Sequence, residues 1–174
     1  TTRDLSWADL HALVARLQQA LGEAGVGPGD RVAAWLPNLP EAYAVMLAAA
    51  SIGAVFSSTS PDFGTSGVLD RFGQIEPTVL FATDGYHYGG KRHDVTGKLA
   101  EVAAALPTLR RVVVVPDSPD GPVGPLPEGA VTLDDFLAPH AAGSVAFEQL
   151  PFDHPLYILY SSGTTGAPKC IVHR

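Results

Sequence analysis

The chain has 174 residues, of which 46% are hydrophobic and 17% are charged, and its net charge is −7. This length and composition suit one folded domain and exclude a disordered chain. The acidic balance disfavours general nucleic-acid binding, because a negative surface repels a polyphosphate backbone. The single cysteine, Cys170, excludes a disulfide within the chain. No signal-peptide pattern or membrane-length apolar run is present, so we expect a cytoplasmic protein without membrane insertion.

Helix and strand signals alternate through the first half of the chain. Ser6 is a good N-cap, and the leucines and valine that follow it recur at helical spacing, which predicts a first helix. Residues 31–37 predict a short buried strand, and Pro40 opens a second helix at its first turn. Residues 54–58 predict a second strand. The segment "TSGVLDRFGQIEP" predicts a third helix that Pro77 closes.

The alternation continues in the second half. Residues 78–82 predict a third strand, followed by a polar loop and a helix over about 94–106. Residues 110–116 predict a fourth strand, whose continuous apolar run suits a sheet covered on both faces. Residues 116–130 are so rich in Pro and Gly that we expect an irregular surface loop there.

A short helix capped by Thr132 and a strand over 156–160 complete the pattern. Strands that alternate with helices at this spacing form βαβ units, so the predicted fold class is α/β, with a mostly parallel sheet and helices on both faces. Ligands of such sheets bind at the carboxyl ends of the strands. The terminal segment "YSSGTTGAPKCIVHR", residues 160–174, leaves the carboxyl end of the last predicted strand.

This terminal segment has the composition of a phosphate-binding loop. Its glycines let the backbone approach a ligand closely, its hydroxyls can donate to phosphate oxygens, and its lysine supplies a positive charge. The residues expected to contact phosphate are Ser161, Ser162, Gly163, Thr164, Thr165, Gly166 and Lys169. The loop is not a Walker A motif, because its second glycine comes too early and Ala167 and Pro168 precede the lysine. A Ser/Thr/Gly-rich surface linker is the alternative, which the position directly after an apolar strand disfavours.

Residues 161–169 match the phosphate-binding signature S/T-S/G-G-S/T-T/S-G-x-P-K of the adenylate-forming enzymes. That superfamily includes acyl-CoA synthetases, peptide-synthetase adenylation domains and luciferases. A second stretch, residues 57–91, resembles the acetoacetyl-CoA synthetases through "SPDFG", "VLDRFGQIEP" and "DGYHYGGK". The resemblance extends over essentially the whole chain, from "LSWADL" to "IVH".

The resemblance implies an acid–thiol ligase. Acetoacetate would attack the α-phosphate of ATP to give acetoacetyl-adenylate and pyrophosphate, and the thiol of coenzyme A would then displace AMP. ATP, Mg²⁺ and CoA are therefore implied, with the glycine-rich loop holding the β- and γ-phosphates. No catalytic residue and no metal ligand is implied in this chain. A second correspondence assigns CoA contact to Tyr88 and Lys91, where acetyl-CoA synthetases have R-x-G-R, with Arg92 as a further positive charge.

Members of this family have several hundred residues. Residues 1–174 are therefore expected to be a single incomplete domain, part of the AMP-binding N-terminal domain, with the acyl pocket and the C-terminal lid domain outside it. Two alternatives stay open: another short-chain acyl-CoA synthetase, such as one for acetate or propionate, and a non-catalytic nucleotide-binding α/β module. We expect Cys170 to be a small buried residue at the start of a strand, because a nucleophile needs a base and a lowered pKa.

Overall fold

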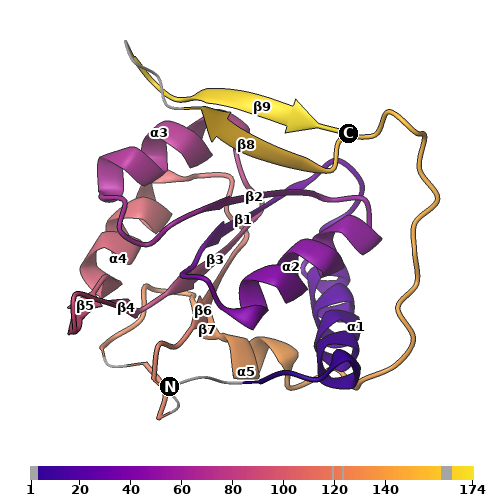
Figure 1. Cartoon of the computed structure of the whole chain (residues 1–174), viewed down its shortest axis with the longest axis horizontal. Helices are drawn as coiled ribbons and strands as arrows, with labels where there is room; N and C mark the ends of the chain where they lie inside the picture. The colour runs from indigo at the N-terminus through magenta and orange to yellow at the C-terminus, as the bar shows by residue number, and fades with distance from the viewer. Residues whose placement is uncertain (1–3, 119, 123, 162–165) are drawn as a thin grey trace.

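The structure is a computed structural model that describes residues 4–118, 120–122, 124–161 and 166–174. Within these residues the chain forms a seven-stranded sheet and a separate two-stranded hairpin (Figure 1). The strands of the sheet are β1 (Arg31–Trp35), β2 (Val55–Thr59), β3 (Val79–Thr83), β6 (Arg111–Val115), β7 (Val131–Thr132), β8 (Tyr157–Ser161) and β9 (Lys169–His173). The hairpin consists of β4 (Gly85–Tyr88) and β5 (Lys91–Asp94).

The order of the strands across the sheet is β7-β6-β3-β1-β2-β8-β9. Each neighbouring pair is parallel except β8 and β9, which are antiparallel. The prediction of a mostly parallel sheet is therefore confirmed. Because parallel strands end at the same edge, the segments that follow β1, β2, β3 and β8 leave the sheet along one side.

Helices cover both faces of the sheet, as the sequence predicted (Figure 1). One layer contains α1 (Trp7–Glu23), α2 (Pro40–Ser51) and α5 (Leu133–Leu137), and the other contains α3 (Thr65–Ile75) and α4 (Thr96–Ala105). The N-cap at Ser6 is confirmed, since its Oγ accepts a hydrogen bond from the Asp9 N–H at 3.1 Å. None of the helices in the described residues is long and apolar enough to cross a lipid bilayer.

Two apolar cores lie on opposite faces of the sheet. On β1, Val32 and Ala34 pack into the core beneath α1 and α2, whereas Ala33 and Trp35 pack into the core beneath α3 and α4. Successive side chains of a strand point to opposite faces, so a strand buried on both sides has to be apolar throughout. This requirement explains the run of four valines in β6, whose members alternate between the two cores.

The structure differs from the sequence prediction in three places. Residues 85–94, predicted as a polar loop, form the β4–β5 hairpin, because Gly89 and Gly90 adopt φ values of 59° and 76° that a two-residue turn requires. The short strand β7 was not predicted. The final segment forms β9, which begins at Lys169, one residue before the predicted start at Cys170. Between 116 and 130 the described residues contain no helix or strand, as expected.

Candidate functional site

The glycine-rich loop is anchored at both ends in the sheet. Ser161 ends β8 and Lys169 begins β9, and these two residues are the last register pair of the antiparallel ladder. On its other side β8 pairs in parallel with β2, where Phe56 and Ser57 are its partners. The backbone positions at which the loop starts and ends are therefore set by hydrogen-bonded strands.

Three of the seven residues predicted to contact phosphate lie in the described part of the chain, namely Ser161, Gly166 and Lys169. The other four, Ser162, Gly163, Thr164 and Thr165, lie outside the described residues. The φ of Gly166 is 153°, a conformation that residues with a side chain rarely adopt. Lys169 is exposed, which leaves its ammonium group accessible to an anion.

Tyr160, the last residue but one of β8, is held by contacts with β2 and α3. The Ser57 Oγ donates to the Ile158 carbonyl at 2.9 Å and lies 3.0 Å from the Tyr160 hydroxyl. The guanidinium of Arg71, on α3, lies 5.8 Å from the centroid of the Tyr160 ring. Burial raises the pKa of Tyr160 to about 12, and the Ser57 hydrogen bond opposes this only in part. Tyr160 is therefore neutral at physiological pH, and it connects β8 to both β2 and α3.

Cys170 lies in a strand, as expected, but it is not the first residue of that strand and is not fully buried. It lies in β9, one residue after Lys169, and is half-buried. Its thiol donates to the Gln74 Oε1 at 3.6 Å, and burial raises its pKa. Because a raised pKa lowers the fraction of thiolate, the environment of Cys170 disfavours a role as nucleophile.

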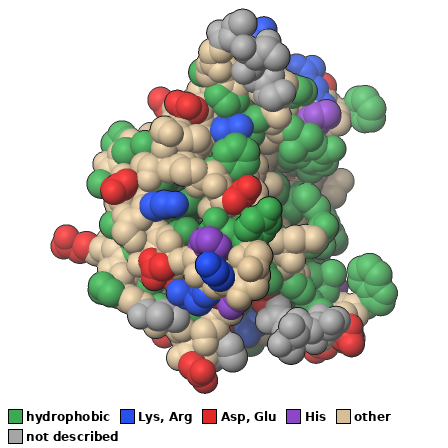
Figure 2. Space-filling view, turned by 60° about the vertical axis from the view of Figure 1, so that its left-hand side comes forward, with side chains coloured by type: hydrophobic (Ala, Val, Ile, Leu, Met, Phe, Trp, Pro, Cys, Tyr) green, Lys and Arg blue, Asp and Glu red, His purple; other side chains and the backbone are tan. Residues whose placement is uncertain are grey.

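The hairpin β4–β5 leaves the carboxyl end of β3 and presents Tyr88 and Lys91, the two residues predicted to contact CoA. They are direct cross-strand neighbours, on either side of the Gly89–Gly90 turn. Both are exposed, and 74% of the Tyr88 surface is accessible. Figure 2 brings the left side of Figure 1 forward. Basic and histidine side chains lie close together near the centre of the face that it shows. The structure therefore places an aromatic ring and an ammonium group side by side at the tip of the hairpin.

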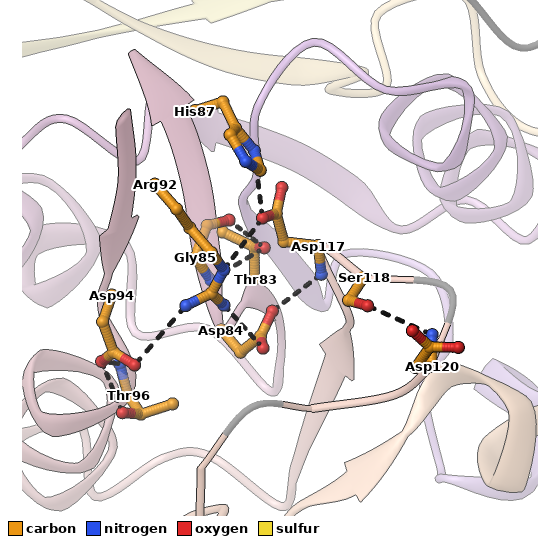
Figure 3. A network of polar contacts seen from close by, with 10 residues as sticks. All are labelled: Thr83, Asp84, Gly85, His87, Arg92, Asp94, Thr96, Asp117, Ser118 and Asp120. Atoms are coloured by element: carbon orange, nitrogen blue, oxygen red, sulfur yellow. Dashed lines mark hydrogen bonds and ion pairs between the residues drawn. The ribbon is translucent and has the colours of Figure 1, made fainter. Parts of the chain in front are cut away.

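Arg92 does not belong to that exposed pair. Its Nη2 lies 3.0 Å from the Asp84 Oδ2 and its Nε lies 3.1 Å from the Asp117 Oδ2 (Figure 3). The Asp117 backbone N–H donates to the other oxygen of Asp84 at 2.7 Å, and the His87 Nδ1 lies 3.2 Å from Asp117. Asp84 is completely buried. The Arg92 Nη1 also lies 3.8 Å from the Asp94 Oδ2, so the guanidinium faces three carboxylates. This argues against our expectation that Arg92 supplies a charge for CoA.

This carboxylate–guanidinium network attaches the hairpin to the ends of β3 and β6. Asp84 directly follows β3 and Asp117 lies just after β6, so Arg92 joins β5 to the ends of two strands of the sheet. A Cβ at Gly85 would collide with the guanidinium and would lie 3.0 Å from the His93 carbonyl oxygen, so this position requires glycine. Sequence reasoning missed the network, although an aspartate directly after an apolar strand was its visible signal.

We predict that Arg92→Ala lowers the free energy of unfolding by about 2–4 kcal/mol, because it leaves the buried Asp84 carboxylate without its cation. Lys91→Ala is the matched control, since Lys91 is the adjacent residue of the same strand and is exposed. The control should change the free energy of unfolding by less than about 0.5 kcal/mol. Urea unfolding of both variants measures the difference, and equal stabilities would contradict the role assigned to Arg92.

The described residues contain no group of three His, Cys, Asp or Glu side chains positioned to hold a metal ion. The loop itself supplies an exposed ammonium group at Lys169 and a hydroxyl at Ser161, at the carboxyl end of a parallel strand. These are groups that bind anions. The fold is that of an α/β domain, and at the carboxyl end of β8 it presents groups of the kind that can bind an anion.

Comparison with known proteins identifies the family. The family model described as "AMP-binding enzyme" matches residues 1–174, so the chain belongs to the AMP-binding enzyme family. It is 59% identical, over 97% of its length, to an acetoacetyl-coenzyme A synthetase of Rhizobium meliloti (strain 1021). It is 42% identical, again over 97% of its length, to a malonamoyl-CoA synthetase of Penicillium aethiopicum.

A solved structure of a similar protein has the same fold over this region. The acetoacetyl-CoA synthetase from Streptomyces lividans superimposes with a TM-score of 0.90 and 48% sequence identity over 98% of this chain. The match covers 25% of that chain, and the chain spans 26% of the R. meliloti relative and 24% of the P. aethiopicum one. The chain therefore corresponds to about a quarter of each of these proteins.

Proposed function

We propose that the full-length protein containing this chain is an ATP-dependent acid–thiol ligase that converts acetoacetate to acetoacetyl-CoA. The observation that supports this most strongly is the loop from Ser161 to Lys169, which carries the adenylate-forming signature at the carboxyl end of β8. The choice of acetoacetate rests on the 59% identity to the R. meliloti enzyme. The 42% identity to an enzyme named for malonamoyl-CoA makes the acid the part of the proposal that most needs a test.

The proposed reaction has two steps. A carboxylate oxygen of acetoacetate bonds to the α-phosphorus of ATP and pyrophosphate leaves, which gives the acyl-adenylate. The CoA thiol, after losing its proton, then bonds to the acyl carbon and AMP leaves. Neither step forms a bond to a residue of this chain. The loop residues would instead hold the β- and γ-phosphates in place, so their contribution is positional and electrostatic.

Lys169 is suited to this role by its position. Its backbone is fixed by pairing with Ser161, while its side chain remains exposed. A charge on a fixed backbone stabilises developing negative charge without much reorganisation, which is what makes such groups effective in catalysis. Gly166 and the hydroxyl of Ser161 would complete the part of the site that the structure describes.

For CoA we propose contact with Tyr88 and Lys91. Lys91 would offer its ammonium group to a phosphate of the nucleotide portion, and Tyr88 would offer a ring face or its hydroxyl. The exposure of both side chains and their cross-strand pairing support this assignment. Arg92 has no part in it, because its guanidinium is paired with Asp84 and Asp117.

Mg²⁺ would accompany ATP and neutralise part of its charge. Among the described residues of the loop there is no carboxylate, so we assign no residue of this chain to the ion and derive no step from it. Within this chain we also propose no catalytic side chain, and we expect residues 1–174 alone to lack ligase activity. The use of ATP and CoA as substrates is the basis on which we propose a cytoplasmic location.

The acid is tested by measuring AMP release from the full-length protein with acetoacetate, malonamate, acetate and propionate. We expect the highest kcat/KM with acetoacetate. A higher value with acetate or propionate would replace our proposal with another short-chain acyl-CoA synthetase. Absence of AMP release with all four acids, in a protein that still binds ATP, would favour a non-catalytic nucleotide-binding module.

We predict that Lys169→Met lowers kcat/KM for ATP about 100-fold in acid-dependent pyrophosphate exchange, since it removes a charge aimed at the phosphates. Lys98→Met is the control, because Lys98 is an exposed lysine on a different element, α4, and has no proposed contact with a ligand. The control should retain wild-type kinetics. An unchanged rate for Lys169→Met would remove Lys169 from the site.

We predict that Lys91→Ala raises the KM for CoA about fivefold in thioester formation, as expected for one exposed charge–phosphate contact. Its KM for ATP in pyrophosphate exchange, which requires no CoA, should be unchanged. Lys98→Ala again serves as the control. A KM for CoA equal to that of the wild type would exclude Lys91 from CoA binding and leave the loop assignment unaffected.

A further inference from the structure

One side chain of α3 holds the segment that returns from the glycine-rich loop to the sheet. The Gln74 Nε2 donates to the Pro168 carbonyl oxygen at 2.8 Å and to the Asp70 carbonyl oxygen, one turn earlier on its own helix, at 2.5 Å. The Gln74 Oε1 accepts from the Cys170 thiol at 3.6 Å. Gln74 therefore contacts the residues immediately before and after Lys169.

The chemistry of these contacts requires an amide. Two of the partners are carbonyl oxygens, which only accept, so the NH₂ group has to face them and the amide oxygen is left for the thiol. Both N–H groups and the oxygen of Gln74 are thus used. A glutamate of the same shape would place a carboxylate oxygen against two carbonyl oxygens and would lose both donors.

The bond to Pro168 adds an anchor that the sheet does not provide. The β8–β9 ladder ends at the pair Ser161–Lys169, so Pro168 is the first residue on the loop side of the last pair. Proline has no N–H, and its carbonyl is its single backbone hydrogen-bonding group. Gln74 takes that carbonyl, which fixes the residue that directly precedes Lys169.

The same helix also holds the other end of the loop. Arg71, one turn before Gln74, lies 4.1 Å from the Phe63 ring centroid and 5.8 Å from that of Tyr160, the residue before Ser161. Helix α3 therefore contacts both the segment that enters the loop and the segment that leaves it. Of Arg71 and Gln74, it is Gln74 that contacts the end of the loop at which Lys169 lies.

We propose that Gln74 is a positioning residue for ATP, which acts by holding Pro168 and Cys170 so that Lys169 is set in place for the phosphates. Gln74 itself is not assigned a contact with the nucleotide. This inference rests on the proposed role of the loop as the ATP-phosphate site. It does not depend on which acid the enzyme activates.

The chain contains a matched control for this role. The Gln19 Nε2, on α1, donates to the Ala15 carbonyl oxygen at 2.9 Å and to the Ala141 carbonyl oxygen at 2.8 Å. Like Gln74, it is exposed and makes one bond to its own helix, four residues back, and one to a distant backbone carbonyl. It differs in its position, because the segment it holds does not contain a residue of the loop.

The experiment compares Gln74→Glu, Gln74→Met and Gln19→Glu in the full-length protein. We measure the dissociation constant of ATP by calorimetry without acid, the kinetic constants for ATP, acid and CoA, and the thermal midpoint. For both Gln74 variants we expect the dissociation constant and the KM for ATP to rise about fivefold to tenfold. The KM values for the acid and for CoA should stay within twofold. Gln19→Glu should have a similar thermal midpoint to Gln74→Glu and wild-type affinity for ATP.

The inference is overturned if both Gln74 variants bind ATP within twofold of the wild type, or if Gln19→Glu weakens ATP binding as much as Gln74→Glu does. A wild-type protein that binds ATP without activating acetoacetate would refute the proposed acid, and the ATP dissociation constants would still decide the role of Gln74. A wild-type protein that binds no ATP would refute the loop assignment and this inference together.

Discussion

The parallel pairing of β2 with β8 is the contact on which the site depends. Residues 56 and 57 of β2 meet residues 157 and 158 of β8, although a hundred residues separate them in the sequence. Ser57 reinforces this short ladder through the Ile158 carbonyl and the Tyr160 hydroxyl. Because β8 is paired in parallel with β2, the segment that follows β8 starts at the edge of the sheet where ligands bind in such folds.

Side-chain contacts from α3 and from the ends of the strands then hold the segments at that edge in place. Gln74 holds the segment before Lys169, and Arg71 packs against Phe63 and Tyr160. At the end of β3, the buried Asp84 fixes Arg92 and with it the β4–β5 hairpin. Lys169 and Lys91 are the exposed residues that we propose contact ligands. Lys169 follows Pro168, whose carbonyl accepts from Gln74, and Lys91 precedes Arg92, which is paired with Asp84.

Much of the fold could be predicted from the sequence because its signals are local. The cap at Ser6, the proline at the start of α2 and the apolar run of β6 each act over a few residues, and each prediction was confirmed within a residue or two at the element ends. The hairpin at 85–94 was missed because its strands are polar, and polar strands lack the alternation that reveals a half-buried strand. The double glycine at its turn was the signal available.

The sequence by itself determined the family. The order of glycines, hydroxyls and lysine after an apolar strand predicted a phosphate-binding loop of the adenylate-forming type, and the family comparison confirmed that the chain belongs to the AMP-binding enzymes. Only the tertiary structure decided which neighbouring residues serve that loop. Arg92 and Gln74 are equally plausible surface residues in the sequence, yet one is paired with a buried carboxylate and the other holds Pro168. The physical reason is that their partners lie 8 and 94 residues away in the chain, and folding alone brings them within hydrogen-bonding distance.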